Sequence, residues 1–526
     1  MRVKIFIYSM LFLIFNVNCK ESSIEQLSLA KERSTNTLKS AIIGTKYYVD
    51  KYGSNSNSGT FLKPFLTIQK GLDAARAGDT VFVKAGTYQE YVTFNNSGIV
   101  GNPIVLKKYN GDIVSVDANY KSVYCVYANN KSNLVIDGIN VKNSTYYNIL
   151  FSGCSNVSVK NVKSDLPLLS SAMNIKLEAG SNWGLNITLQ DVITYGGVVG
   201  VYLGPKLNGV NIIRGKYSYA GLDGINLTSG LVTDTAQFSR NILVDGSETS
   251  YNSRQGILTW CLKKATFRNF WSHHNSATGI QIENNSSKIL IEDFLCENNS
   301  LGGGFETGVW IDDSADCTVR RGTMRNNQTG FRVSNSQNVL AYNLLIYSNT
   351  FTKIAADYTN NSSGVNFYSN PIGTTNNLYI CSVKLYNSVI YNNGNAYSQR
   401  GAMSIQGAGN YIIKNNIITQ NLSTSDIYRT GTHTLISDNN LIFNTKAISV
   451  YYTPTTNWVA PMTWSAYKTT TGQDAHSINA YPQFINGELK LQSTSPGING
   501  GVNVGLSTDY LGSPIKGLPD IGAFEY

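Results

Sequence analysis

The chain has 526 residues, of which only 14% are charged, with 47 glycines, 33 tyrosines, 11 prolines and a formal net charge of +9. Abundant glycine and tyrosine with few charges are typical of many short strands joined by polar turns, and they argue against a helical protein. The mild basic excess fits an anionic partner, but the sequence has no dense run of lysine and arginine, so we expect no nucleic-acid partner.

The first 19 residues have the pattern of an export signal. Arg2 and Lys4 precede an apolar run over residues 5–15 that is too short to cross a bilayer, and Cys19 follows the run. The segment resembles a bacterial lipoprotein signal peptide, which implies a lipid on Cys19 as the sole membrane contact; an ordinary secretion signal is the alternative. We therefore expect a secreted protein, or an outer-membrane or cell-surface lipoprotein, of a bacterium, with residues 20–44 as a flexible tether.

Residues 45–110 carry the signals expected at the N-terminal end of the fold, its cap and first coils. From Tyr47 the sequence predicts a strand, a glycine turn, a short amphipathic helix from Thr67 to Arg76 and a second strand. A helix in that place would cover the open first coil of a repetitive structure. The stretch resembles the start of right-handed parallel β-helix proteins among polysaccharide lyases and glycosidases, and the resemblance implies that fold.

Two kinds of short strand then alternate along the chain, and each kind returns about every two dozen residues. The first kind follows an asparagine, as in NLVIDGINV from Asn133, NVSVKNV from Asn156 and NILVDGS from Asn241. The second kind is led by glycine and includes VGVYLG, DGINLT, QGILTW, TGIQIE, TGVWID and TGFRVS. Both alternate apolar and polar residues with a period of two, so each is a strand with one buried face.

Such a series of strands is typical of a parallel β-solenoid, in which each coil hydrogen-bonds to the next and the inward side chains form one continuous core. A propeller needs longer antiparallel blades, and a sandwich would not keep this register. We therefore predict an all-β protein, a right-handed parallel β-helix with an N-terminal capping helix, in a single domain over residues 45–526. Residues 449–526, whose end resembles the terminal segment of secreted bacterial β-helix proteins, are expected to form an insertion and a C-terminal cap. We expect a monomer.

The glycine-led strands place two carboxylates on one outward column of side chains. Residues one and three positions after the glycine are apolar and point inward, whereas those two and four positions after it point outward. Equivalent positions of stacked coils lie about 4.8 Å apart. The fourth position then brings Glu283 and Asp312 to adjacent coils, with Trp260 before them and with Trp310 and Arg332 on the neighbouring column.

Two adjacent carboxylates repel each other, so an unoccupied surface gains nothing from them, and three uses are open. Glu283 and Asp312 could bind a divalent cation such as Ca2+, with Asp223 and Asp313 as further ligands. One carboxyl could stay protonated as an acid while the other acts as a nucleophile, as in retaining glycosidases. Arg332 could instead neutralise Asp312. A solvated polar face of a solenoid is the alternative without function.

Further side chains of the same outward face are candidates for contact with a polysaccharide substrate. The tryptophans offer flat surfaces of the kind that stack on sugar rings, and polar side chains stand on the neighbouring column. The predicted substrate-binding residues are Trp260, Trp310, Gln281, Asn226 and Tyr202. Lys206, which extends from the same face, is a candidate base.

Family motifs agree with the fold more closely than with any single activity. Calcium-dependent β-helix pectate lyases of the ninth lyase family have an aspartate before the glycine and a catalytic lysine four residues after it, whereas this chain has Asp223 but Thr228 in the place of the lysine. The polygalacturonase motifs NTDG, GHG and RIK do not occur. GVWID resembles the carboxylate-bearing strand of some β-helix glycosidases. That resemblance implies a catalytic role for Asp312, with Glu283 as its partner because Ser334 replaces the acid expected one coil later.

Three functions are therefore open. The leading prediction is a lyase that cleaves an acidic, uronate-containing polysaccharide by β-elimination. In it Ca2+, held by Glu283 and Asp312 with Asp223, binds the substrate carboxylate, while Arg332 or Lys206 removes the proton. The second is a glycoside hydrolase that uses the Glu283–Asp312 pair. The third is a non-catalytic glycan-binding solenoid of the cell surface.

Overall fold

A computed structural model of the chain describes residues 44–166, 172–180, 183–230, 233–299, 307–350, 362–370, 378–394, 401–423, 425–445, 448–453 and 462–526. The predicted export signal, the lipid on Cys19 and the tether up to residue 43 lie outside the described residues. Thr45–Tyr526 form one compact unit.

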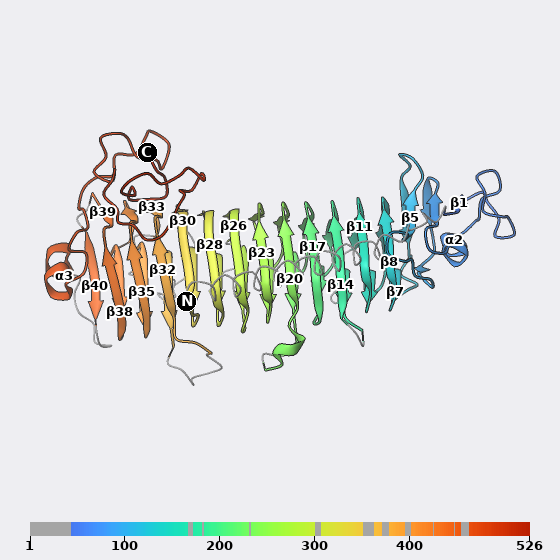
Figure 1. The fold of residues 1–526 in the computed structure, drawn as a ribbon, viewed down its shortest axis with the longest axis horizontal. Helices are drawn as coiled ribbons and strands as arrows, with labels where there is room; N and C mark the ends of the chain where they lie inside the picture. The colour runs from blue at the N-terminus through green and yellow to red at the C-terminus, as the bar shows by residue number, and fades with distance from the viewer. Residues whose placement is uncertain are drawn as a thin grey trace, which may run out of the picture. The chain divides into compact units, whose positions relative to one another are not determined.

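This unit is a parallel β-solenoid with two sheets, one of 15 and one of 26 strands. In Figure 1 the coils follow one another along the long axis, from β1 at one end to β40 near the other. We call the 15-stranded sheet the glycine sheet, because it contains the glycine-led strands, and the 26-stranded sheet the long sheet.

The glycine sheet consists of β4 (Val92–Thr93), β7 (Tyr124–Asn129), β10 (Tyr147–Ser152), β13 (Met173–Glu178), β16 (Val199–Leu203), β19 (Ile225–Thr228), β22 (Ile257–Trp260), β25 (Ile280–Glu283), β27 (Thr307–Asp312), β29 (Thr329–Ser334), β31 (Ser363–Ser369), β34 (Met403–Gly407), β37 (Ile427–Thr430), β40 (Ser449–Thr453) and β41 (Met462–Thr463). Its pairs are parallel, apart from the antiparallel pair of β40 and β41.

The long sheet consists of β1 (Lys46–Val49), β2 (Thr80–Val83), β3 (Gly86–Tyr88), β5 (Ile104–Lys108), β6 (Val114–Asp117), β8 (Ser132–Asp137), β9 (Ile139–Lys142), β11 (Ser155–Lys160), β12 (Lys163–Leu166), β14 (Gly184–Gln190), β15 (Ile193–Gly196), β17 (Leu207–Ile213), β18 (Lys216–Ser218), β20 (Arg240–Asp245), β21 (Glu248–Ser250), β23 (Lys263–Arg268), β24 (Trp271–His273), β26 (Ser287–Glu297), β28 (Ala315–Arg325), β30 (Val339–Tyr347), β32 (Ser382–Tyr386), β33 (Val389–Tyr391), β35 (Gly409–Lys414), β36 (Ile417–Thr419), β38 (His433–Asp438) and β39 (Leu441–Phe443).

The repeated glycine of the glycine sheet has a steric cause. A Cβ atom on Gly279 would lie 2.6 Å from the carbonyl oxygen of Gly308, and a Cβ atom on Gly308 would lie 2.8 Å from that of Gly330. Both distances are shorter than a carbon and an oxygen tolerate, so only glycine lets one coil approach the next at this position. The glycines therefore fix the register that aligns the coils.

Asparagines at the bends form a buried ladder parallel to the solenoid axis. Asn275 Nδ2 donates to Asn299 Oδ1 at 2.9 Å, and Asn299 Nδ2 donates to Asn327 Oδ1 at 3.1 Å. All three side chains are buried, and stacked amides satisfy polar groups that would otherwise be costly to bury. Other bend residues, such as Asn269 and Asn298, have the left-handed backbone that asparagine tolerates.

The core is a single stack of inward side chains that continues from coil to coil. Ile257, Ile280, Val309 and Phe331 lie one above another in register and are fully buried. The six cysteines of the described part are also buried and form no disulfide. Apolar burial along the axis, rather than cross-linking, therefore stabilises the unit.

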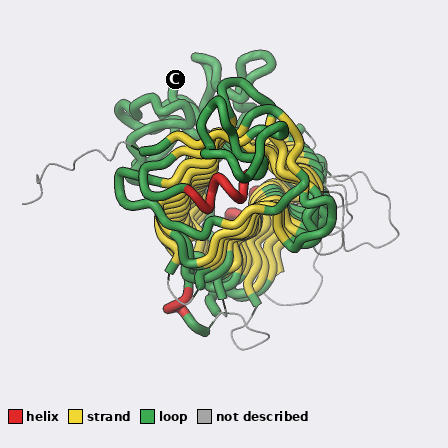
Figure 2. The backbone as a smooth tube through the Cα atoms, turned by 90° about the vertical axis from the view of Figure 1, so that its right-hand side faces the viewer, coloured by secondary structure: helices red, strands yellow, loops and turns green. Residues whose placement is uncertain are grey.

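The helix that the sequence predicts from Thr67 to Arg76 is present as α2 (Ile68–Ala74). The Thr67 hydroxyl accepts a hydrogen bond from the amide of Lys70 at 3.3 Å, as an N-cap residue does. Ile68 and Leu72 belong to the main core. Figure 2 looks along the stack from the end that carries this helix.

The C-terminal segment does more than follow the last coil. Helix α3 (Trp464–Thr471) contributes Trp464 and Tyr467 to the main core. The residues after it run back along the long sheet, where Asn415 Nδ2 donates to the carbonyl of Val502 at 2.7 Å. Further along, the Tyr510 hydroxyl lies 2.9 Å from Thr323 Oγ1. The segment predicted as an insertion and cap thus also covers part of the solenoid wall (Figure 1).

Helix is rare in the described part of the chain, which contains α2, α3 and a single 3-10 turn, η1 (Thr235–Gln237). In that part, no helix combines the length and the apolar composition that a bilayer crossing requires. The predicted all-β parallel solenoid is confirmed.

Candidate functional site

The strand register aligns the outward columns that the sequence predicts. Gln281 of β25 pairs with Trp310 of β27, and Trp310 pairs with Arg332 of β29. The last pair of this register is Ile282 with Ile311, and Glu283 and Asp312 follow directly at the ends of the two strands. The two carboxyls are close enough for the charge of Asp312 to raise the pKa of Glu283. Two carboxylates at this distance repel each other, so their environments determine which of them is ionised.

Glu283 lies at the end of β25 and is held by an amide relay. Gln281 Nε2 donates to Glu283 Oε2 at 2.6 Å, and Gln255 Nε2 donates to Gln281 Oε1 at 2.8 Å. Burial, and then the charge of Asp312, raise the pKa of Glu283 to about 7, although the hydrogen bond from Gln281 and the charge of Arg254 oppose the shift. Near neutral pH this carboxyl therefore exists in both protonation states.

Asp312, one rung further, has a different environment. Ser334 Oγ donates to its Oδ1 at 2.5 Å, and Trp310 Nε1 donates to the same hydroxyl at 2.8 Å. Burial raises the pKa of Asp312, while the Ser334 hydrogen bond and the Arg332 charge oppose the rise. Specific interactions thus favour the ionised form of Asp312, whereas the nearest charge to Glu283 favours its protonated form.

Two tryptophans flank the pair, as predicted. Trp260 pairs with Glu283 on the preceding rung, and Trp310 stands beside Asp312 on β27. Both side chains are half-buried. The guanidinium carbon of Arg332 lies 4.4 Å from the centre of the Trp310 ring, so one face of that ring contacts a cation rather than solvent.

Asp223, a predicted metal ligand, is already bound by side chains of the protein. It is fully buried, and Arg254 from the next coil binds it with two hydrogen bonds, Nε to Oδ1 at 2.9 Å and Nη2 to Oδ2 at 2.5 Å. Asn226 Nδ2 also donates to Asp223, at 2.7 Å, and Thr228 in turn donates to Asn226. The aspartate therefore organises a bend between coils.

The predicted Ca2+ ligands do not form a cation site in the described residues. Asp313 follows β27 in a left-handed turn and accepts a hydrogen bond from the amide of Leu378 at 3.2 Å. Burial and the neighbouring Asp312 raise the pKa of Asp313 to about 6. Across the described ranges, no three histidine, cysteine, aspartate or glutamate side chains are placed to hold a metal ion. With Asp223 bound by Arg254, the donor set does not fit calcium.

Lys206, the predicted base, is not brought to the acid pair. It lies in the turn between β16 and β17, with a left-handed backbone, and β16 is three rungs from β25. Three rungs correspond to roughly 14 Å along the axis, which is too far for a shared proton. Tyr202, on β16, is equally distant but lies on the same column as Gln281.

Three residues of the site were missed by sequence reasoning about function. Ser334 and Gln255 stand on the predicted outward columns, so their positions carried a signal, although neither was expected to bind a member of the pair or its partner. Arg254 lies in a bend, where alternation does not hold, and nothing in its sequence context indicates the contact with Asp223.

Two family models match the chain over adjoining regions. A model of a Pel9A-like right-handed β-helix region matches residues 47–187, and a model of a right-handed β-helix region matches residues 179–372. These matches confirm the predicted handedness and the predicted resemblance to pectate-lyase-like β-helix proteins. The acid pair lies in the second region, whose model describes a fold and no particular activity.

Curated relatives share short stretches with the chain. The uncharacterized protein YwoF of Bacillus subtilis is 31% identical over 105 residues, which are 19% of this chain and 22% of that protein. Pectate lyase PEL9 of Emericella nidulans is 34% identical over 79 residues, which are 15% of this chain and 19% of that protein. The chain thus matches about a fifth of the length of each relative.

Among solved structures, pectate lyase Pel9A is similar over 92% of this chain and 98% of its own, with 15% identity and a TM-score of 0.34. Agreement at this level concerns the kind of fold, and it places no catalytic residue.

Proposed function

The chain folds as a right-handed parallel β-helix, and we propose that it is a polysaccharide-cleaving enzyme whose catalytic pair is Glu283 and Asp312. The observation that carries the proposal is the alignment of the two carboxyls on adjacent rungs, with the pKa of Glu283 raised to about 7. Cleavage of a glycosidic bond needs a proton donor to the leaving oxygen, and a carboxyl that is half-protonated near neutral pH suits that role.

Hydrolysis is the route that the pair supports best. Glu283 would protonate the glycosidic oxygen while the carboxylate of Asp312 attacks the anomeric carbon, so that the glycosidic C–O bond breaks and a glycosyl ester forms. Glu283, now ionised, would take a proton from water, and the water oxygen would displace Asp312 from the sugar. Adjacent strand backbones lie about 4.8 Å apart, a spacing that allows two neighbouring carboxyls to reach the separation of about 5–5.5 Å that this two-step mechanism uses.

β-Elimination on a uronate polymer is the second route. Arg332 lies beside Asp312 and could pair with the substrate carboxylate, and the Pel9A-like match favours a lyase. A base removes the proton at C5, the C4–O bond breaks to leave a C4–C5 double bond, and Glu283 protonates the leaving oxygen. Asp312 would be the base, since Lys206 is three rungs away and an arginine rarely loses its proton. The elimination as written uses no calcium ion, because Asp223 is bound by Arg254 and the predicted ligands, within the described residues, do not form a calcium site.

One screen separates these routes. The purified full chain is incubated with uronate-containing, sulfated and neutral polysaccharides, and both new reducing ends and the ultraviolet absorbance of unsaturated uronate are measured. Hydrolysis gives reducing ends alone, and elimination gives both signals. If no polysaccharide is cleaved but one is retarded on native gels, the chain is a glycan-binding solenoid and the proposal of catalysis falls.

Variants of the pair then test the assignment. Glu283→Gln and Asp312→Asn keep the size of each side chain and remove its charge, so either should lower cleavage by about 100-fold or more. Asp165→Asn, on β12 of the long sheet and exposed beside Lys163, is the control. Full activity in both pair variants would refute the site even if the chain cleaves a polysaccharide.

For its location we propose export with a lipid on Cys19, which would hold a monomeric enzyme at the bacterial surface. Replacement of Cys19 by serine should move the protein from the membrane fraction to the medium. Retention of that variant in the membrane fraction would refute the lipid anchor.

A further inference from the structure

The outward face that carries the acid pair continues toward the N-terminus as one unbroken column. In register, Thr93 of β4 pairs with Tyr127, Tyr127 with Leu150, Leu150 with Lys176, and Lys176 with Tyr202. From Tyr202 the column passes through Asn226, Leu258 and Gln281, whose side chains are largely buried among their neighbours, to β25. Seven rung steps therefore separate β4 from the rung of Glu283, roughly 34 Å along the axis.

Tyrosines crowd the N-terminal part of this face. Tyr124 stacks on Tyr127 with ring centroids 4.5 Å apart, and Tyr91 meets Tyr124 edge-to-face at 5.9 Å. Tyr147 lies in register with Tyr124 on the next rung. Tyr91 is 54% exposed, so it presents a ring to solvent that contributes little to the core.

A cation lies midway along the tyrosines. Lys176 Nζ lies 5.0 Å from the ring centre of Tyr147 and 5.9 Å from that of Tyr202, and it pairs with Glu178 at 2.8 Å. The hydrogen bond and charge of Glu178 raise the pKa of Lys176 even though burial, the largest influence, lowers it. A fixed ammonium group between two aromatic rings suits a ligand that offers apolar faces together with hydroxyl or acid groups.

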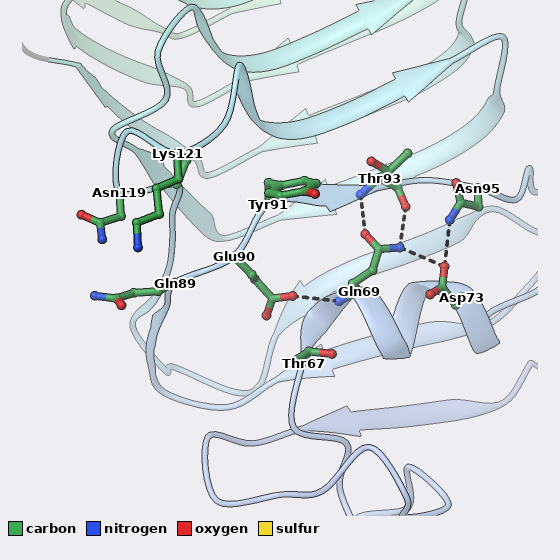
Figure 3. A pocket seen from close by; sticks show the side chains of 11 residues that line it. Thr67, Gln69, Asp73, Gln89, Glu90, Tyr91, Thr93, Asn95, Asn119 and Lys121 are labelled. Carbon is green, nitrogen blue, oxygen red and sulfur yellow. Dashed lines mark hydrogen bonds between the residues drawn. The ribbon is translucent and has the colours of Figure 1, made fainter.

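The column ends in a cavity of about 580 Å³ beside α2, which Thr93 and Tyr91 help to line (Figure 3). Its floor is held rigidly. Glu90 accepts hydrogen bonds from the amides of Ile68 and Gln69 at 2.9 and 3.1 Å, and the Gln69 side chain donates to the Thr93 carbonyl at 3.1 Å. These hydrogen bonds tie Glu90 and Thr93 to the first turn of α2. The cavity walls are therefore held in place before a ligand binds.

The opposite side of the cavity carries exposed polar groups. Gln89, Asn119 and Lys121 line it, and Figure 3 shows them grouped to the left of Tyr91 and of the helix. Within the described residues, no hydrogen bond or ion pair occupies the side chains of these three. Two amides and an ammonium group facing an exposed tyrosine are the groups that sugar recognition uses: a ring to stack on the apolar face of a sugar, and donors and acceptors for its hydroxyls.

We infer that this cavity and the tyrosines of β7, β10 and β16 form a distal glycan-binding site that is continuous with the acid pair. The inference rests on the proposed function for its substrate, a polysaccharide, and adds that the bound polymer occupies the face from β4 to β27. If one sugar ring spans about one rung, the occupied stretch is of the order of seven or more rings.

A binding experiment tests the site without requiring catalysis. Full-length Glu283→Gln protein, which should not cleave, is run on native gels that contain polygalacturonate, alginate, hyaluronan or xylan. Tyr91→Ala with Tyr124→Ala should weaken retardation by the bound polymer about 30-fold, since each lost stacking contact lowers the affinity about fivefold. Tyr195→Ala is the matched control, because Tyr195 is 48% exposed but lies on β15 of the long sheet.

Chain length provides a second readout. Affinity of the Glu283→Gln protein for oligosaccharides of the bound polymer should rise from three to about seven sugar units, and the double tyrosine variant should lose that rise. The site is overturned if none of the four polymers retards the protein, if the tyrosine variant binds as the control does, or if affinity stops rising at three units. If the tyrosine variant loses binding while the unmutated chain cleaves nothing, the site stands and the proposed catalysis falls.

Discussion

Charged side chains occur on neighbouring rungs in two regions of the solenoid, with opposite outcomes. On the long sheet, Glu292 of β26 is in register with Arg320 of β28, and Glu297 with Arg325. Each pair closes to 2.6 Å between a carboxylate oxygen and a guanidinium nitrogen. Opposite charges in register on adjacent rungs are therefore close enough to form ion pairs, and these pairs stabilise the long sheet.

On the glycine sheet the same spacing opposes Glu283 to Asp312, and the hydrogen bonds that they accept from side chains come from the neutral Gln281 and Ser334. Burial raises the pKa of each carboxyl, and the charge of Asp312 raises that of Glu283 further. Holding Glu283 and Asp312 close together and largely buried lowers the stability of the folded chain. Such a cost is typical of functional sites. The comparison predicts that mutations in the two regions have different effects, on rate in the one and on stability in the other.

The largest expected effect is on rate. Glu283→Gln should lower polysaccharide cleavage by about 100- to 10,000-fold, because the proton donor to the leaving oxygen is lost. Thermal unfolding of this variant should remain cooperative and should not shift downward. Glu292→Gln is the control from the other region, and its cleavage rate, measured well below its melting temperature, should stay within about twofold of the original. Equal losses of rate in both variants would remove the distinction between the regions.

The second effect is on stability and runs the other way. Glu292→Gln leaves the guanidinium groups of Arg320 and Arg321 without the carboxylate they share, at 2.6 and 2.9 Å, so the free energy of unfolding should fall by about 1–3 kcal/mol. Urea unfolding measures the change. Asp165→Asn, which removes a more exposed contact with Lys163 at 3.5 Å, should change it by no more than about 0.5 kcal/mol. A larger loss of unfolding free energy in Asp165→Asn than in Glu292→Gln would show that the contacts of Glu292 with Arg320 and Arg321 stabilise the fold no more than an exposed ion pair does.

The third effect is a pH dependence of stability. The folded chain holds the Glu283 proton up to about pH 7, whereas in the unfolded chain the pKa is near 4.5. Between these values the folded state binds more protons, so this group's contribution to stability falls as the pH rises. Glu283→Gln, which cannot ionise, should therefore be more stable than the original by about 1–3 kcal/mol at pH 8 and equal to it at pH 4.

Melting temperatures at the two pH values check this prediction. Glu292→Gln serves again as the comparison, because it removes a stabilising partner and should be less stable than the original at pH 8. A stability difference for Glu283→Gln that is the same at pH 4 and pH 8 would mean that the carboxyl has an ordinary pKa, and the argument for a general acid would lose its basis.

The register of the glycine sheet can be predicted from the sequence, because glycine is needed wherever the backbone of one coil contacts that of the next. The repeated glycine of TGIQIE and TGVWID therefore predicts the register of the two strands, which the structure has up to Ile282 and Ile311, the residues directly before Glu283 and Asp312. Alternation also predicts Trp310 and Arg332 as neighbours on one column. Parallel strands joined in register make the neighbours of a residue predictable even when they are distant in the chain.

Contacts made by the bends between strands, and by the C-terminal segment that runs back along the long sheet, cannot be predicted in the same way. Arg254 reaches Asp223 from a bend, where side chains do not alternate, so an aspartate that looked free for a metal is in fact bound. The contact of Tyr510 with Thr323 joins residues 187 apart in the chain and depends on the path of an irregular tail. Neither has a periodic signal, because neither depends on the rung spacing.

The smallest expected effect concerns the hydrogen bond to Asp312. Ser334→Ala removes the donor that lies 2.5 Å from Asp312 Oδ1, and because that hydrogen bond favours the ionised carboxylate, the pKa of Asp312 should rise further. Catalysis needs Asp312 ionised, and the rate falls as the pH drops through that pKa; the acid limb of the rate profile should therefore move to higher pH while the alkaline limb, set by Glu283, stays in place. Ser334→Thr, which keeps a hydroxyl, should restore the original profile. A uniform loss of rate at every pH would mean instead that Ser334 acts by supporting the Trp310 indole, to which it is also hydrogen-bonded at 2.8 Å, and that the carboxylate needs no help to ionise.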